Sequence, residues 1–323
     1  MAETVFVTGG SGFIGGRLVQ RLVGEGHAVR ALARSDSAAE RVAKLGAEPV
    51  RGDLGDLTSL TAGADGADVA FHLAAHLGEW GPWEDFERGN VVGTRNTLAA
   101  CEEAGVGRFV HCGTEAALMA GEPLVHVDET APLRPDSRAP YPATKAKAEQ
   151  AVRAAARDGF ETVALRPRFV WGKGDTTLLP EMVATVESGR FAWVGGGRNV
   201  TDTTHVDNVV EGLLLAAAKG RSGEAYFVTD GEPVVFREFV TALLRTQGVE
   251  PPGRNLPAWT AAPMARVCEA GWRLLPLPGE PPMTSFRSWL LTQECTIEIA
   301  KARAELGYEP VVSRDQGLAE MRD

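Results

Sequence analysis

The chain has 323 residues, which is enough for one large α/β core and a smaller appended lobe. Its formal net charge of −10 gives a nucleic-acid or anionic membrane partner no electrostatic support. The four cysteines are scattered without a C-x-x-C pair, which disfavours a disulfide framework or a zinc site and suits a reducing, cytoplasmic setting. No stretch is long and apolar enough for a membrane span, and the amino terminus shows no signal-like segment.

The first 166 residues alternate short apolar strand patterns with longer helical ones. The strand patterns are Thr4–Thr8, Ala28–Ala33, Glu48–Arg51, Val69–Leu73, Arg108–Cys112 and Thr162–Arg166. The helical patterns between them include Gly12–Val23, Phe86–Ala104 and Ala143–Ala156. Strands separated by helices predict a Rossmann-type α/β fold, a doubly wound parallel sheet buried on both faces.

After Pro167 the rhythm changes, and from Gly231 onward the chain is richer in Pro and Trp. The further elements that we expect are a loop (Gly172–Thr177), a helix (Leu178–Ser188), a glycine turn (Gly195–Gly197), a helix (Val206–Ala218), a strand (Ala225–Thr229) and helices at Phe236–Thr246, Trp259–Leu275 and Ile297–Leu306. The pattern predicts a dinucleotide-binding domain over residues 1–170, to which residues 200–230 return. Residues 171–199 and 231–323 are expected to form a smaller C-terminal substrate-binding lobe.

A glycine-rich segment joins the first strand to the first helix. Thr8–Gly15 spells T-G-G-S-G-F-I-G, with Gly9, Gly12 and Gly15 spaced as G-x-x-G-x-x-G. The first glycine permits a tight turn, the second lets the backbone approach a pyrophosphate, and the third allows close helix packing. The helix N-terminus adds oriented N–H donors, so the segment predicts a dinucleotide site.

The ends of the second and third strands bear on the choice of cofactor. Asp53 either accepts from the adenine amino group or is a turn aspartate, and Leu54 would pack on the ring. Arg34 follows the second strand, where no carboxylate is present to bind a ribose 2′-hydroxyl. Arg34 is therefore either a ligand of a 2′-phosphate or a surface residue. The pattern favours NADP(H) and leaves NAD(H) open.

Tyr141 and Lys145 stand four residues apart, which places both on one helix face. A free phenol has a pKa of about 10, and a nearby cation lowers that pKa towards neutrality. We expect this pair to transfer the proton, and Thr114 to donate to the substrate oxygen. Glu115 is either a second acid or base, or a solvated or helix-starting residue. Cys112 is interpreted as a small core residue.

The histidines do not predict a metal site. His72 and His76 are four residues apart, but they lie at the end of an apolar strand rather than on a helix. His72 is interpreted as a hydrogen-bonded core residue, and His205 as a structural or helix-capping residue before Val206.

Seven segments resemble landmarks of the extended short-chain dehydrogenase/reductase superfamily, in the same order. They are Thr8–Gly15, Gly52–Leu54, Phe71–Ala75, Asn90–Thr94, Tyr141 with Lys145, Arg166–Gly172 and His205–Val209. Within the superfamily the chain is most similar to the 3β-hydroxysteroid dehydrogenase group, which includes sterol-4α-carboxylate 3-dehydrogenases. Thr114 stands where many relatives have serine, and Gly113 before it is unusual.

The resemblance implies a role for each of several further residues. Leu73, Ala74 and Ala75 would line the cofactor, Asn90 would support the active-site framework, and Pro167 would lie beside the nicotinamide. The residues expected at the cofactor are Gly9, Gly12, Phe13, Ile14, Gly15, Arg34, Asp53, Leu54, Leu73, Ala74, Ala75, Asn90, Tyr141, Lys145 and Pro167. A homodimer through the helices around 86–104 and 143–156 is the family expectation.

The predicted activity is hydride transfer between NAD(P) and a secondary alcohol or ketone, such as a 3β-hydroxysteroid or a similar apolar substrate. Trp80, Trp83, Trp193 and the helix Trp259–Leu275 are expected to close an apolar slot over the nicotinamide. The alternatives are a nucleotide-sugar epimerase or dehydratase, a reductase of smaller ketones, and a non-catalytic dinucleotide sensor. Thr201 argues against a nucleotide sugar, because those relatives usually carry an arginine there to bind the diphosphate.

Overall fold

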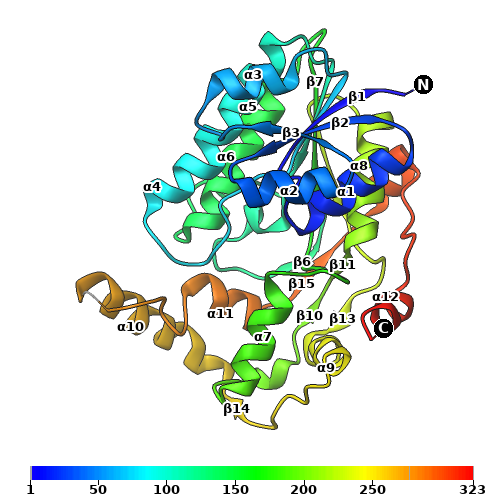
Figure 1. The fold of residues 1–323 in the computed structure, drawn as a ribbon. Helices are drawn as coiled ribbons and strands as arrows, with labels where there is room; N and C mark the ends of the chain where they lie inside the picture. The colour runs from blue at the N-terminus through cyan, green and yellow to red at the C-terminus, as the bar shows by residue number, and fades with distance from the viewer. Residues whose placement is uncertain (1, 276, 323) are drawn as a thin grey trace.

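The computed structural model describes residues 2–275 and 277–322, and Figure 1 shows their arrangement. A seven-stranded sheet has the order β12-β7-β5-β4-β1-β2-β3, and every pairing in it is parallel. Its strands are β1 (Thr4–Thr8), β2 (Ala28–Ala33), β3 (Glu48–Arg51), β4 (Val69–His72), β5 (Arg108–Cys112), β7 (Glu161–Pro167) and β12 (Glu224–Val228). The Rossmann-type prediction is confirmed. The strand order reverses between β1 and β4, where such sheets bind ligands beyond their carboxyl ends.

Helices cover both faces of this sheet (Figure 1). On one face lie α1 (Phe13–Gly24), α2 (Asp36–Lys44) and α8 (Val206–Lys219), and on the other lie α3 (Leu57–Ala64), α5 (Gly93–Glu103) and α6 (Pro140–Ala154). The strands are apolar on both sides because Val5 and Val7 belong to one core cluster and Phe6 to the other. Two-sided burial explains why these strands read as continuous apolar runs.

A second, four-stranded sheet lies beyond the carboxyl ends of the large one (Figure 1). Its order is β13 (Val234–Val235), β10 (Val200–Thr201), β15 (Cys295–Ile297) and β6 (Leu124–Val127). The sequence patterns did not predict this sheet, because strands of two to four residues are too short to show alternation. The helix expected from Ile297 is wrong at its start, since Ile297 lies in β15 and the π-helical turn covers Ala302–Leu306.

The remaining elements surround the second sheet or link it to the first. The helices are α4 (Trp83–Phe86), α7 (Leu178–Glu187), α9 (Phe236–Thr246), α10 (Ala261–Leu274), α11 (Ser285–Thr292) and α12 (Arg314–Glu320). Two small parallel pairs join β8 (Val170–Trp171) to β11 (Thr204–His205) and β9 (Trp193–Val194) to β14 (Asn255–Leu256). Short 3₁₀ turns lie at Glu115–Leu118, Gly195–Gly197 and Ala258–Thr260. Within residues 2–275 and 277–322, no helix is both long and apolar enough to cross a bilayer.

Two helix boundaries differ from the sequence patterns. The single helix expected over 86–104 is interrupted, because a π-helical stretch (Glu87–Val92) separates α4 from α5. Helix α6 begins three residues before the expected Ala143, at Pro140, and proline is favoured at the first position of a helix. This earlier start brings Tyr141 and Lys145 into the first two turns.

Candidate active site

The glycine-rich loop between β1 and α1 lies directly against the end of β4. Gly9 has a φ of +77°, and a Cβ atom there would stand 2.6 Å from the backbone nitrogen of Ala74. Gly12 donates its N–H to the Gly9 carbonyl at 3.0 Å, and a Cβ on Gly15 would collide with that same oxygen. Gly9 and Gly15 thus stand where no side chain fits. The N-cap of α1 has no side-chain cap, so the first N–H groups of the helix are free to bind an anion.

The ends of β2 and β3 lie side by side, because Ala33 pairs with Arg51 in the sheet. Arg34 follows β2 with an exposed side chain. Ser35 caps α2 by accepting a backbone N–H of the first turn at 3.2 Å. The carboxylate of Asp36 is paired with the guanidinium of Arg51 at 3.1 Å. The edge therefore presents the cation of Arg34 next to a helix N-terminus, an arrangement that suits an anion.

Asp53 and Leu54 follow β3 and shape the adjoining turn. Asp53 is exposed, and its Oδ1 accepts from the backbone N–H of Gly55 at 2.9 Å. Leu54 lies close to Gly93, where a Cβ would stand 2.8 Å from the Leu54 Cδ1 atom. Asn96 donates to the Leu54 carbonyl at 2.8 Å. Asp53 acts here as a turn aspartate, and its contact with an adenine stays a prediction.

Helix α6 carries Tyr141 and Lys145 on one face, one turn apart. Lys145 is buried, and its Nζ donates to the carbonyl oxygen of Cys112 at 3.0 Å. This hydrogen bond holds the amine at the carboxyl end of β5. Burial lowers the pKa of Lys145, while the neighbouring Cys112 and Glu149 oppose that change. Cys112 itself is buried, as predicted.

The phenol of Tyr141 has a raised pKa. Burial is the main cause, the negative charge of Glu115 and the Cys112 side chain add to it, and Thr114 opposes it through a hydrogen bond. The expectation that a nearby cation lowers this pKa is therefore wrong. The physical reason is that burial disfavours the charged phenolate and the negative charge of Glu115 disfavours it further. Tyr141 consequently holds its proton throughout the neutral range.

Thr114 begins a chain of buried polar contacts that the sequence patterns did not reveal. Its hydroxyl donates to Glu115 Oε2 at 2.8 Å, and the other carboxylate oxygen is paired with Arg168. Arg168 follows Pro167, the last residue of β7, and its Nε and Nη2 donate to the Thr201 hydroxyl at 3.2 and 3.1 Å. The side chains of Glu115 and Arg168 are only 5% and 2% exposed. Glu115 starts a short helix, as one of the alternatives predicted, and its side chain is buried rather than solvated.

Gly113 lies over a second buried ion pair. It donates its N–H to the Leu165 carbonyl at 2.7 Å, and a Cβ there would stand 3.1 Å from that oxygen and 3.5 Å from Glu149 Oε2. Glu149 and Arg166 form a bidentate pair, and both side chains are fully buried. The close approach of Gly113 to this pair explains why glycine precedes Thr114.

Asn90 ties two segments of the site together from the π-helical stretch. Its Oδ1 accepts from the backbone N–H of His76 at 2.7 Å, and its Nδ2 donates to the His76 carbonyl at 3.1 Å and to the Thr144 hydroxyl at 3.0 Å. Thr144 lies between Tyr141 and Lys145 on α6. Asn90 therefore fixes the loop after β4 to the helix that carries the pair.

His72 and His205 both have structural roles. The ring nitrogens of His72 lie 2.7 Å from the Thr8 hydroxyl and 2.9 Å from the Thr94 hydroxyl. Burial, with a contribution from Lys145, lowers the pKa of His72 to about 3, so the ring is neutral. His205 caps α8 by accepting from the N–H of Asp207. Both interpretations are confirmed.

The elements around the second sheet cover the phenol. The rings of Tyr141 and Phe286, on α11, have centroids 5.9 Å apart. The neighbouring Arg287 donates to Glu79 at 2.7 Å and to Glu181, on α7, at 2.7 Å. Thr284 also donates to Glu79, at 3.1 Å. The loop after β4 is thus tied to α11, which places an aromatic ring over Tyr141.

A protein-family model described as the 3-beta hydroxysteroid dehydrogenase/isomerase family matches residues 6–258. The chain belongs to this family. The 4-hydroxy-2-methyl-3-oxo-4-farnesyl-3,4-dihydroquinoline-1-oxide ketoreductase of Stigmatella aurantiaca is 47% identical over 317 residues, 98% of this chain and 95% of that protein. The 2-alkyl-3-oxoalkanoate reductase of Stenotrophomonas maltophilia is 40% identical over 98% of both chains. Like these relatives, the chain is an NAD(P)-dependent oxidoreductase acting on CH–OH or keto groups.

The fold is also similar to that of a nucleotide-sugar enzyme. A double mutant of DesIV, a dTDP-glucose 4,6-dehydratase from Streptomyces venezuelae with NAD bound, superposes with a TM-score of 0.74 at 26% identity, over 98% of this chain and 95% of that one. In the present member of the 3-beta hydroxysteroid dehydrogenase/isomerase family, Thr201 stands at the position where an arginine would be expected to bind the diphosphate of a nucleotide sugar. Its side chain is buried and engaged by Arg168.

Two of the tryptophans expected in an apolar slot lie elsewhere in this family member. Trp193 is 2% exposed and packs in the core of the second sheet's helices, beside Phe191 and Arg237. Trp259 is 77% exposed. The expectation is therefore wrong for both, because tertiary packing and not composition decides which tryptophans face a site. Phe286, which does face Tyr141, carries no motif that singles it out in the sequence.

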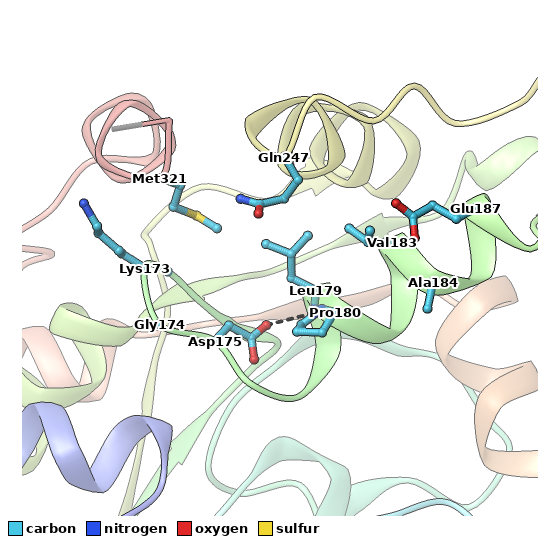
Figure 2. Close-up of a pocket in the computed structure, with 11 residues that line it drawn as sticks. Lys173, Gly174, Asp175, Leu179, Pro180, Val183, Ala184, Glu187, Gln247 and Met321 are labelled. Carbon is cyan, nitrogen blue, oxygen red and sulfur yellow. Dashed lines mark hydrogen bonds between the residues drawn. The ribbon is translucent and has the colours of Figure 1, made fainter. Parts of the chain in front are cut away.

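A hollow of about 480 Å³ lies away from these residues. Figure 2 shows it between α7, the loop after β8, Gln247 and Met321. Asp175 is one of its lining residues and accepts from the backbone N–H of Leu179 at 2.9 Å. The residues proposed below for catalysis are absent from its lining, so this hollow is not the reaction site.

Proposed function

We propose that this family member is an NADPH-dependent reductase of an apolar ketone. The observation that carries the proposal is the convergence of Thr114, Tyr141 and Lys145 at the carboxyl edge of the sheet, beneath the ring of Phe286. Thr114 follows β5, and Tyr141 and Lys145 lie on α6, next to the switch point between β1 and β4. Ligands of doubly wound sheets bind at this place.

Tyr141 is proposed as the proton donor. A ketone that accepts a hydride becomes an alkoxide, and the alkoxide needs one proton to form the alcohol. The raised pKa keeps the Tyr141 phenol protonated at neutral pH, which suits the direction of reduction. Thr114 steadies the phenol through its hydroxyl, and Glu115 in turn accepts the proton of that hydroxyl at 2.8 Å.

Lys145 is proposed to position the cofactor and to supply positive charge near the phenolate that forms. Its Nζ has one protein partner, the Cys112 carbonyl, in the described contacts, and an ammonium has three donors. The remaining donors are available to ribose hydroxyls or to the phenolate. Asn90 is proposed as a positioning residue, because it orders the segment around Thr144.

The residues present fit a dinucleotide. Gly9 and Gly15 bring the backbone close to β4, and the uncapped start of α1 offers N–H donors to a pyrophosphate. Phe13, Ile14 and Leu73–Ala75 lie beside this loop, and Pro167 lies at the end of β7. The reduced nicotinamide supplies the hydride when it is bound. Arg34 is proposed to bind the 2′-phosphate of NADP(H), because its exposed cation adjoins the start of α2.

The substrate is proposed to be a ketone attached to a bulky apolar group. The relative from Stigmatella aurantiaca acts on a farnesylated 3-oxo quinoline, and the ring of Phe286 offers an apolar contact above Tyr141. A nucleotide sugar would bring two phosphate charges, and unpaired buried charge costs far more than apolar contact returns. Thr201 is uncharged, and its hydroxyl accepts from Arg168, so this position offers a diphosphate no free cation. The lobe formed by residues 171–199 and 231–323 is proposed to hold the apolar group.

The test is a panel of substrates with each cofactor, followed by absorbance at the reduced nicotinamide band. The panel contains a farnesylated quinolone ketone, a 2-alkyl-3-oxoalkanoate, a 3-oxosteroid, a small aliphatic ketone and a UDP- or dTDP-sugar. We expect reduction of apolar ketones with NADPH in preference to NADH. Faster turnover of the nucleotide sugar would overturn the substrate assignment, and tight cofactor binding without turnover of any member would favour the non-catalytic alternative. Sedimentation of the full chain tests the proposed homodimer.

A further inference from the structure

Helix α10 and the residues next to it expose an apolar surface. The side chains of Trp259, Val267 and Leu274 are 77%, 72% and 82% exposed, which makes them the most exposed large apolar side chains in the described chain. Leu275 and Leu277 follow at 56% and 40%. Single exposed apolar residues are common on protein surfaces, but a contiguous group marks an interaction site.

The exposed apolar residues within the helix share one face, which we name the outer face of α10. Within the helix, Pro263, Val267, Ala270 and Leu274 are spaced by four, three and four residues and are all exposed. The opposite face packs inward through a different set of apolar residues, including Ala261 and Ala265. Apolar residues thus lie on two sides of the helix, and among the described residues only one of these sides has a packing partner. Figure 1 shows α10 standing out from the rest of the molecule.

The charges beside the outer face are positive. Arg266 and Arg273 are exposed and seven residues apart, so they border the apolar stripe on one side. The carboxylate on the same helix, Glu269, is turned inward, where its oxygens accept from the N–H and hydroxyl of Ser285 at 2.6 and 3.0 Å. The net charge of −10 therefore does not describe this surface, and charges farther than about 10 Å away are largely screened.

We propose that the outer face of α10 docks on the surface of an anionic lipid bilayer. Trp, Leu and Val side chains of an amphipathic helix enter the boundary between headgroups and acyl chains, while arginines at its border pair with lipid phosphates. A second copy of the chain fits less well, because the helix offers no free carboxylate that could pair with Arg266 and Arg273 of another copy, since Glu269 is engaged by Ser285. The helix lies on the bilayer and does not span it.

The docked helix would lie close to the candidate active site. The guanidinium of Arg273 lies over the ring of Trp80, 5.4 Å from its centroid. Trp80 is in the loop whose Glu79 is bound by Arg287. Helix α10 also packs against α11, which carries Phe286. Docking would thus hold α11, whose Phe286 lies over Tyr141, near the lipid in which an apolar ketone dissolves. Only this consequence depends on the proposed function.

Co-sedimentation of the full chain with vesicles tests the docking itself, without any substrate. We expect binding to vesicles of phosphatidylglycerol and phosphatidylcholine, and at least about tenfold weaker partitioning onto phosphatidylcholine alone or at high salt. The double variant Val267→Glu/Leu274→Glu should lose about tenfold or more in partitioning. The matched control Val125→Glu/Val311→Glu alters residues that are 48% and 52% exposed elsewhere, and it should bind as the unmodified chain does.

A second pair of variants separates charge from apolar contact. Arg266→Gln/Arg273→Gln should weaken binding to anionic vesicles and leave the weak binding to phosphatidylcholine unchanged. The proposal is overturned if the unmodified chain does not prefer anionic vesicles, or if both outer-face variants bind as the control does. It is also overturned if sedimentation shows dimers that Val267→Glu/Leu274→Glu converts to monomers while vesicles bind neither form. Activity measured in lipid-free buffer reports on the proposed function separately.

Discussion

The ring of Tyr141 lies 5.9 Å from the ring of Phe286, although 145 residues separate the two in the chain. The contact joins α6 to α11, so it links the reaction centre to the proposed substrate-binding lobe. Burial is the main reason that the phenol keeps its proton, and the negative charge of Glu115 adds to it, whereas the hydrogen bond with Thr114 acts in the opposite direction.

Replacing Tyr141 by phenylalanine tests the proton donor. Tyr141→Phe removes the hydroxyl and keeps the contact with Phe286, so folding and NADPH affinity should hardly change. Turnover of the best ketone should fall by about 10²-fold or more, the range expected for general acid catalysis. Steady-state rates and fluorescence titration of NADPH measure the two effects, and near-normal turnover would contradict the assignment.

Replacing Arg34 tests the cofactor preference. Arg34→Ala should weaken NADPH binding about ten- to a hundredfold and leave NADH binding unchanged, because only NADPH carries the 2′-phosphate that a charge-assisted hydrogen bond would hold. Arg41→Ala is the matched control, since Arg41 is another exposed arginine of the α2 region. Equal losses for both cofactors would show that Arg34 is a surface residue without a ligand.

Replacing Glu115 tests its influence on the phenol. The negative charge of Glu115 raises the pKa of Tyr141, so Glu115→Gln should lower that pKa. Ketone reduction requires protonated Tyr141 and declines as the pH rises through its pKa. The alkaline decline of kcat should therefore move to lower pH in the variant.

Glu149→Gln is the control for Glu115→Gln, because Glu149 also forms a buried pair, with Arg166. Each variant removes one partner of a buried ion pair and should lose about 3–5 kcal/mol of unfolding free energy. Only Glu115→Gln should shift the alkaline decline that reports the Tyr141 phenol, since Glu149 acts on the pKa of Lys145 and not on that of the phenol. A profile that moves equally in both variants would reduce Glu115 to a purely structural role.

Replacing Phe286 tests the apolar cover. Phe286→Leu should raise KM for a bulky apolar ketone about tenfold and leave kcat nearly unchanged, because the lost contact exists in both the bound substrate and the transition state. Phe239→Leu changes a buried phenylalanine of α9, in the core cluster that contains Trp193, and should alter neither constant. An unchanged KM in Phe286→Leu would place the substrate elsewhere.

Local spacing in the sequence was enough to predict the parts of this protein that depend on neighbouring residues. Gly9, Gly12 and Gly15 predict a tight loop because a turn is decided within a few residues, and the structure shows that Cβ atoms would collide at Gly9 and Gly15. Tyr141 and Lys145 share a helix face because the helix repeats every 3.6 residues. The alternation of apolar strand patterns with helical patterns predicted the parallel sheet, because strands that are joined by helices run parallel.

The tertiary structure alone decided which distant residues meet. The pair of Glu115 and Arg168, the contact of Tyr141 with Phe286 and the four-stranded sheet depend on packing between segments that are far apart in the chain, and no periodicity encodes such contacts. Burial likewise decided the direction of the Tyr141 pKa, because desolvation and the charge of Glu115 outweigh the opposing hydrogen bond from Thr114. Spacing shows which groups lie on one face, whereas a pKa depends on the solvent and charge around a group after the chain has folded.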